Sequence, residues 1–189
     1  MPNWMNRSGD AMLIAISGPR GAGKSSLAYS ILLLLKHHGI ACGGVLTLGQ
    51  ERKRFFCVQD QKNYPFEIEG EPDPINVGKY RISQSALQFA TTAIADGINH
   101  EVLFIDEIGI LESQQRGLYE ATMAALRSSN KVIILVIRQD IIKLVKALFG
   151  VEPDQLVIVE PQKREGLAER LARDVISMLF GDNHAGTSG

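Results

Sequence analysis

The chain has 189 residues, of which 45% are hydrophobic and 22% are charged, and its formal net charge is −1. This composition is that of an ordinary globular domain, so disorder of the whole chain is excluded. The balanced charge provides no global attraction to nucleic acid or anionic lipid. The longest aliphatic run, residues 132–137, is far shorter than the roughly 20 residues that cross a bilayer, so we expect no membrane segment.

The length indicates one domain, at about 150 residues per domain. We expect a single folded domain over residues 11–180, preceded by a flexible leader (1–10) and followed by a flexible tail (181–189). The two cysteines, Cys42 and Cys57, form no CxxC pair, which favours reduced thiols. The sequence therefore predicts a cytoplasmic protein.

The first predicted unit is a strand followed by a helix. Residues 12–16 form a wholly apolar run that ends at turn-forming residues, as in a strand buried on both faces of a parallel sheet. Apolar residues then recur at helical spacing over residues 27–35, and Gly39 supplies the stop signal.

An antiparallel element follows. Strands are expected at residues 41–48 and 55–59, with the polar residues 50–54 between them as the tip of a hairpin. Residues 61–76 contain three prolines and are expected to be a surface loop with little regular structure. A short edge strand is predicted at residues 80–82.

The second half alternates strands with helices. Ser83 or Ser85 can cap the first of these helices, and Asp140 can cap the third. The pattern predicts strands at 102–105, 132–137 and 156–159, and helices at 86–97, 113–128, 140–150 and 167–178. Strands that alternate with amphipathic helices indicate a layered α/β domain around a mostly parallel sheet, here with an antiparallel edge hairpin.

Residues 18–25, GPRGAGKS, match the phosphate-loop pattern G-x-x-x-x-G-K-[ST] at every fixed position. Such a loop turns successive N–H groups toward phosphate oxygens, and the helix that follows directs its positive end at the same anion. Lys24 would add a charge for the β- and γ-phosphates, and the Ser25 hydroxyl can ligate Mg²⁺. The residues expected to bind nucleotide are Gly18, Pro19, Arg20, Gly21, Ala22, Gly23, Lys24, Ser25 and Ser26. For Arg20, a side chain that is simply solvated is the alternative interpretation.

Two carboxylates, Asp106 and Glu107, end the second apolar strand. Ligand sites of parallel sheets lie at the carboxyl ends of the strands. Asp106 is therefore expected to hold the magnesium ion together with Ser25, and Glu107 to orient or deprotonate an attacking water. Ordinary loops also begin with such pairs, so the assignment depends on the phosphate loop.

The chain resembles the cancer-related nucleoside-triphosphatase family, which also has members in thermophilic microbes. The resemblance covers about residues 12–180. It is carried by the phosphate loop (18–26), by Gly43-Gly44-Val45-Leu46-Thr47, by Val77-Gly78-Lys79-Tyr80, and by Asp106-Glu107-Ile108-Gly109 followed by Glu112. It implies a three-layer P-loop fold of the RecA-like, additional-strand type and Mg²⁺-dependent hydrolysis of ATP, GTP and other nucleoside triphosphates.

The resemblance also suggests roles for two arginines. Arg138 is similar to a family arginine that could sense or stabilise the γ-phosphate, although a surface ion pair is the alternative. Arg164 lies in a stretch similar to a family Asn-Arg-x-x-Leu motif near the base, with Lys163 in place of the asparagine. Glu112 is expected to favour a helix N-terminus rather than to touch substrate.

Two other functions stay open at this stage. The first is a small-molecule kinase, against which the absence of an evident arginine-rich lid between residues 110 and 165 counts. The second is a nucleotide-gated module that binds a protein partner. The basic run at residues 51–54 could suggest nucleic-acid binding, but a charged hairpin tip that protects an edge strand is the commoner role of such a run.

Overall fold

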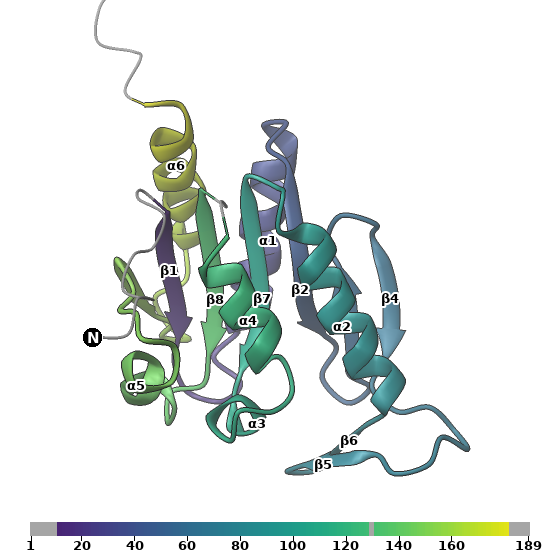
Figure 1. Ribbon diagram of the computed structural model, residues 1–189. Helices are drawn as coiled ribbons and strands as arrows, with labels where there is room; N and C mark the ends of the chain where they lie inside the picture. Colours follow the sequence, from purple (N-terminus) through teal and green to yellow (C-terminus); the bar gives the residue numbers. More distant parts are fainter. Residues whose placement is uncertain (1–10, 129–130, 182–189) are drawn as a thin grey trace, which may run out of the picture.

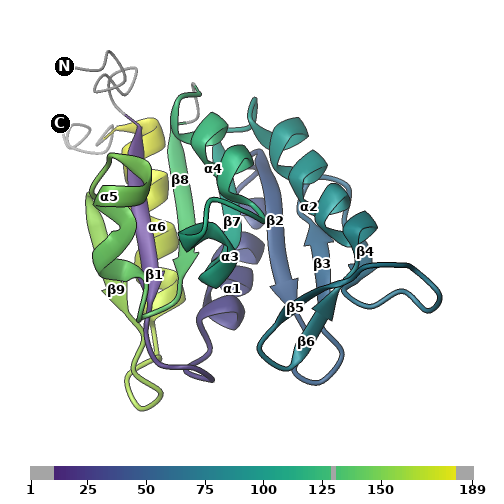
Figure 2. The ribbon, with the colours of Figure 1, turned by 60° about the horizontal axis from the view of Figure 1, so that its bottom comes forward.

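The central sheet has seven strands in the order β4-β3-β2-β7-β8-β1-β9 (Figures 1 and 2). The computed structural model describes residues 11–128 and 131–181, so the predicted leader and residues 182–189 of the predicted tail lie outside the described residues. The strands are β1 (Met12–Ser17), β2 (Cys42–Leu48), β3 (Arg54–Cys57), β4 (Lys62–Pro65), β7 (Val102–Ile108), β8 (Val132–Ile137) and β9 (Gln155–Ile158).

Strand order confirms the predicted fold class. Strands β2, β7, β8, β1 and β9 run parallel, and β3 and β4 add the antiparallel edge. β8 lies between β1, which leads into the phosphate loop, and β7, which carries the two carboxylates. This intervening strand is the additional strand expected from the sequence. It also puts the carboxyl ends of β1 and β7 at one edge of the sheet.

Helices cover both faces of the sheet and give three layers (Figure 2). α1 (Lys24–His37) and α6 (Leu167–Phe180) pack on one face, and α2 (Gln84–Gly97) and α4 (Tyr119–Leu126) on the other. The sequence of β1 explains why both faces of the sheet can be covered. Leu13 and Ala15 belong to the core on the α2 side, and Ile14 and Ile16 belong to the core on the α1 side. A strand buried on both faces has to be apolar at every position, as the sequence indicated. None of the helices among the described residues is both long enough and apolar enough to traverse a lipid bilayer.

The prediction of a single helix over residues 113–128 is wrong. A short helix, α3 (Ile110–Ser113), ends first, and α4 begins only at Tyr119. The buried Glu112 carboxylate accepts the backbone N–H of Gly109 and that of Leu118, each at 2.8 Å. It therefore caps the start of α3, as expected, and also holds residues 114–118 in a turn that separates α3 from α4.

Two further expectations are corrected. Asp140 does not cap a long helix: a 3₁₀ turn, η1 (Ile142–Leu144), and the short α5 (Val145–Phe149) follow it, while its carboxylate pairs with Arg138. Residues 61–76 are not wholly irregular. They contain β4 and also β5 (Ile75–Val77), which pairs with β6 (Tyr80–Ile82) in a separate two-stranded sheet. The predicted strand at 80–82 is confirmed, and Ser83 caps α2 by accepting the N–H of Ala86.

Candidate active site

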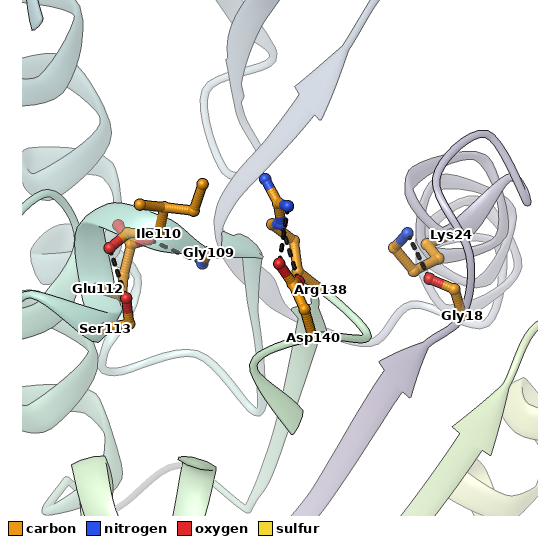
Figure 3. Close-up of polar contacts among 8 residues, drawn as sticks. All are labelled: Gly18, Lys24, Gly109, Ile110, Glu112, Ser113, Arg138 and Asp140. Atoms are coloured by element: carbon orange, nitrogen blue, oxygen red, sulfur yellow. Dashed lines mark hydrogen bonds and ion pairs between the residues drawn. The ribbon is translucent and has the colours of Figure 1, made fainter. Parts of the chain in front are cut away.

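The phosphate loop connects the end of β1 to the first residue of α1. Its entry residue, Gly18, has a φ of 142°, and a Cβ there would lie 2.6 Å from the carbonyl oxygen of Val159. Only glycine fits this turn. The buried Lys24 opens α1, and its Nζ donates to the carbonyl oxygens of Gly18 and Pro19 at 3.0 and 3.1 Å (Figure 3 shows the Gly18 contact). The ammonium group is thus folded over its own loop, at the position where it can turn to a phosphate.

Arg164 reaches the same loop from the segment before α6. Its guanidinium lies directly against Gly23, in the space that a Cβ would fill. Gly23 immediately precedes the N-terminus of α1. An exposed arginine held at this point adds positive charge where the helix already presents free N–H groups. The structure therefore brings together the loop and the arginine that the resemblance had associated with the base.

Asp106 is fully buried, and only one of its carboxylate oxygens is engaged. Oδ2 accepts the N–H of Thr47 at 3.1 Å, and the Thr47 hydroxyl donates to the backbone oxygen of Asp106 at 2.7 Å. Oδ1 is buried and has no hydrogen-bond partner among the described residues. Burial, and after it the neighbouring Glu107, raises the pKa of Asp106 to about 7, although Ser25 and Thr47 act to lower it. Such a carboxylate gains strongly from a bound cation.

The available oxygens fit a magnesium ion. The Ser25 hydroxyl lies near enough to the Asp106 carboxylate to lower its pKa, and Asp106 Oδ1 is buried without a hydrogen-bond partner among the described residues. Hard oxygen ligands of this kind suit Mg²⁺. No cluster of three or more His, Cys, Asp or Glu side chains that could hold a metal occurs in residues 11–128 and 131–181.

A second group of side chains surrounds Gly109, and it consists of Glu107 and Arg138. A Cβ on Gly109 would lie 3.0 Å from Arg138 Cδ and 3.7 Å from Glu107 Oε1, so the two side chains approach the same point. Arg138 donates from Nε and Nη2 to the two carboxylate oxygens of Asp140, at 3.1 and 2.9 Å (Figure 3). This bond holds the pKa of Asp140 below its usual value, and the charge of Lys24 adds to the effect. Arg138 therefore forms a surface ion pair, which was the alternative to its expected γ-phosphate role, and it does so next to Glu107.

The remaining predicted residues differ in their surroundings. Arg20 is exposed and lies beside the Tyr80 hydroxyl, and Ser26 is exposed on the first turn of α1. Sequence reasoning missed the role of Thr47, which anchors Asp106, although residues 43–47 were among the motifs that carried the family resemblance. It likewise gave no role to Tyr80, which ends the motif at residues 77–80.

A phosphate loop on β1, a carboxylate pair on β7 and an intervening β8 together define a P-loop NTPase of the additional-strand class. A family model described as NTPase matches residues 13–172. The chain belongs to this family of nucleoside triphosphatases, which confirms the resemblance seen in the sequence. Membership favours hydrolysis over the kinase and the nucleotide-gated module.

Individual relatives agree with this assignment. A nucleoside-triphosphatase THEP1 from Methanothermobacter thermautotrophicus is 26% identical over 182 residues, which is 92% of this chain and 98% of the relative. The THEP1 of Ignicoccus hospitalis is 30% identical over 128 residues, or 65% of this chain and 73% of the relative.

Two solved structures share the fold. The crystal structure of THEP1 from Aquifex aeolicus has a TM-score of 0.65 at 20% identity, over 85% of this chain and 96% of that one. The solution structure of a human cancer-related nucleoside triphosphatase has a TM-score of 0.64 at 19% identity, over 90% and 98%.

Proposed function

We propose that the protein hydrolyses ATP, GTP and other nucleoside triphosphates to the diphosphate and inorganic phosphate, with Mg²⁺ as cofactor. The observation that carries this proposal is the unpartnered oxygen of buried Asp106 beside the phosphate loop, with Glu107 next to it. A metal anchor and a group that handles water are what triphosphate hydrolysis needs in addition to a phosphate cradle.

Residues 18–26 bind the phosphates in this proposal. The loop amides and the N-terminus of α1 donate hydrogen bonds to the β-phosphate, and Lys24 exchanges its bonds to the carbonyl oxygens of Gly18 and Pro19 for bonds to phosphate oxygens. Ser25 and Asp106 hold Mg²⁺, which when bound neutralises charge on the β- and γ-phosphates. In this proposal Arg164 contacts the nucleotide beyond the loop, which is supported by its packing against Gly23.

Glu107 and Arg138 serve the reaction itself. Glu107 is partly exposed, so its carboxylate can accept a proton from a water and orient it in line with the leaving diphosphate. Arg138 stabilises charge on the γ-phosphoryl group after releasing Asp140, an exchange that is inexpensive because their ion pair is solvent-exposed.

The test is phosphate release from ATP, GTP, CTP and UTP, with and without Mg²⁺. Glu107→Gln is expected to slow release by roughly 100-fold or more, because general-base catalysis contributes about 10²- to 10⁴-fold. Its affinity for a non-hydrolysable triphosphate should stay within about threefold of the parent protein. Glu120→Gln, an exposed position on α4, is the matched control and should keep full activity. Unchanged turnover in Glu107→Gln would remove Glu107 from the reaction.

Two broader expectations accompany this proposal. Both hydrophobic clusters pack against one sheet, which supports residues 11–180 folding as a single unit. Cys42 and Cys57 are free and buried, in keeping with a reducing compartment, and the cytoplasmic location stays a prediction.

A further inference from the structure

Three cations gather around the ring of Tyr80. Lys53 Nζ lies 4.7 Å from the ring centroid and Lys79 Nζ lies 5.2 Å from it. The Arg20 guanidinium is beside the Tyr80 hydroxyl, which donates to the carbonyl oxygen of Gln50 at 3.2 Å. Segments that are far apart in the sequence therefore converge on one ring: the phosphate loop, the tip between β2 and β3, and the β5–β6 arm.

This cluster lies at the edge of the sheet that carries the active site. Figure 2 shows β5 and β6 on the same side of the molecule as the loop between β1 and α1. β2 ends one residue after Thr47, the anchor of Asp106, and the tip with Lys53 follows directly. Although burial dominates the pKa of Asp106, the Lys53 ammonium is among the charges that act to lower it.

No carboxylate among the described residues lies at ion-pair distance from the cluster of Arg20, Lys53 and Lys79, although Glu51, Glu67, Glu69 and Glu71 line the same cavity as Lys53 and Tyr80. Desolvation acts to raise the pKa of Tyr80, but Arg20 and the two lysines outweigh it and the pKa is lowered. A ring face holds cations without cancelling their charge, so the three cations keep the capacity to bind a phosphate group.

The cluster is also accessible. Lys53 and Tyr80 line a cavity of about 650 Å³ formed by the hairpin tip, the segment after β4 and the β5–β6 arm. Lys53 and Tyr80 are each half-buried, so both keep room to turn toward a ligand. The attraction between an ammonium group and a ring face is modest, so the ammonium can move to a stronger, charged acceptor.

We propose that this cluster binds the γ-phosphate of the substrate and makes the site select triphosphates over diphosphates. Arg20 and Lys53 donate to γ-phosphate oxygens, Lys79 adds charge, and Tyr80 is a positioning residue that holds the cations. The inference rests on the proposed function, because it assumes that the β-phosphate occupies the loop and the γ-phosphate extends toward Asp106. The phosphate loop binds phosphates of diphosphates and triphosphates alike. The cluster would therefore supply the preference for triphosphates that the loop does not.

The experiment compares Lys53→Met with Lys62→Met, an exposed lysine of β4 in a weak surface pair, as matched control. Calorimetry gives the dissociation constants for adenosine diphosphate and for a non-hydrolysable adenosine triphosphate analogue, both with Mg²⁺. Lys53→Met should weaken triphosphate binding about tenfold or more and diphosphate binding less than about threefold, because it removes one charge-assisted contact to the γ-phosphate. Lys62→Met should change neither constant, and Lys53→Arg should restore most of the preference.

Tyr80 is tested by the same ratio of dissociation constants. Tyr80→Phe keeps the ring beneath the lysines and removes the hydroxyl that meets Arg20 and Gln50, so a smaller loss of triphosphate preference is expected. Tyr80→Leu removes the ring as well and should match Lys53→Met. A purely structural role would alter thermal stability but leave this ratio unchanged.

The possible failures are distinguishable. Parent protein that neither binds a triphosphate nor releases phosphate overturns the proposed function. Active parent protein whose Lys53→Met variant keeps the full triphosphate preference overturns the present inference alone. An equal loss of diphosphate and triphosphate binding in Lys53→Met also overturns it, because the γ-phosphate would then not be the group recognised.

Discussion

Replacing Asp106 by asparagine should stabilise the folded protein while abolishing its activity. The substitution keeps the shape of the side chain. The asparagine carbonyl can still accept the Thr47 N–H, and the new NH₂ group takes the place of the unpartnered Oδ1 near the Ser25 hydroxyl, which can accept. What changes is the cost of keeping a negative charge in a fully buried position.

The size of this cost follows from the pKa of Asp106. Burial, with a further contribution from Glu107, raises the folded-state pKa from the ordinary 3.8 to about 7. Because the folded value is the higher one, ionisation opposes folding, and this penalty grows as the pH rises from about 4 to about 7. The full difference corresponds to up to about 4 kcal/mol above pH 7, and to about 2 kcal/mol at pH 5.

Urea unfolding of the nucleotide-free protein, without Mg²⁺, at pH 5 and pH 8 measures this prediction. Asp106→Asn should be more stable than the parent protein at both pH values, and its advantage should be about 2 kcal/mol larger at pH 8. Mg²⁺-dependent phosphate release should fall by about two orders of magnitude or more. Asp73→Asn, at an exposed aspartate before β5, is the control and should change neither property.

Two results would refute the reasoning. If Asp106→Asn is no more stable than the parent at pH 8, the buried charge carries no penalty. If its advantage is the same at pH 5 and pH 8, the stabilisation has a cause other than ionisation. Full activity in this variant would instead show that Asp106 is not a metal ligand.

Two other substitutions address the surroundings of the site. Arg138→Ala should lower phosphate release at least about tenfold, because an arginine at the γ-phosphoryl group stabilises the transition state, while Asp140→Ala should retain activity since it only frees the guanidinium. Comparable losses in the two variants would indicate that the ion pair has a structural role instead. Glu112→Gln should destabilise the protein by about 1–3 kcal/mol in urea unfolding, because the buried carboxylate accepts two N–H groups and an amide can accept only one of them. Ser113→Ala, on the exposed side of α3, is its control, and equal stability of the two variants would contradict the assignment.

The fold class and the centre of the site could be predicted because their signals are local. An apolar strand, a glycine-rich turn and an amphipathic helix occupy consecutive residues, so the β1–α1 unit is specified by its own sequence. The same holds for β7, whose apolar run leads to Asp106. The carboxyl ends of parallel strands share an edge, so the nearness of the loop and Asp106 followed from the predicted strand directions.

The failed predictions concern segments whose structure depends on distant partners. β4 reads Lys-Asn-Tyr-Pro, is mostly exposed and shows no apolar alternation, so only its pairing with β3 makes it a strand. The helix expected over residues 113–128 is broken because Glu112 accepts the N–H of Leu118, and residue spacing alone does not reveal that bond. Aspartate is a residue type that often caps helix N-termini, but the Asp140 carboxylate accepts hydrogen bonds from Arg138 instead.

The sequence by itself determined where the phosphate loop lies and which carboxylates follow the apolar run of the neighbouring strand, because backbone conformation and strand burial are encoded over a few neighbouring residues. Only the tertiary structure decided which side chains surround that centre. Arg164 against Gly23, and Arg20, Lys53 and Lys79 around Tyr80, come from segments separated by tens of residues. Their meeting depends on strand order and on the placement of the β5–β6 arm, and these are set by packing across the whole domain rather than by any one segment.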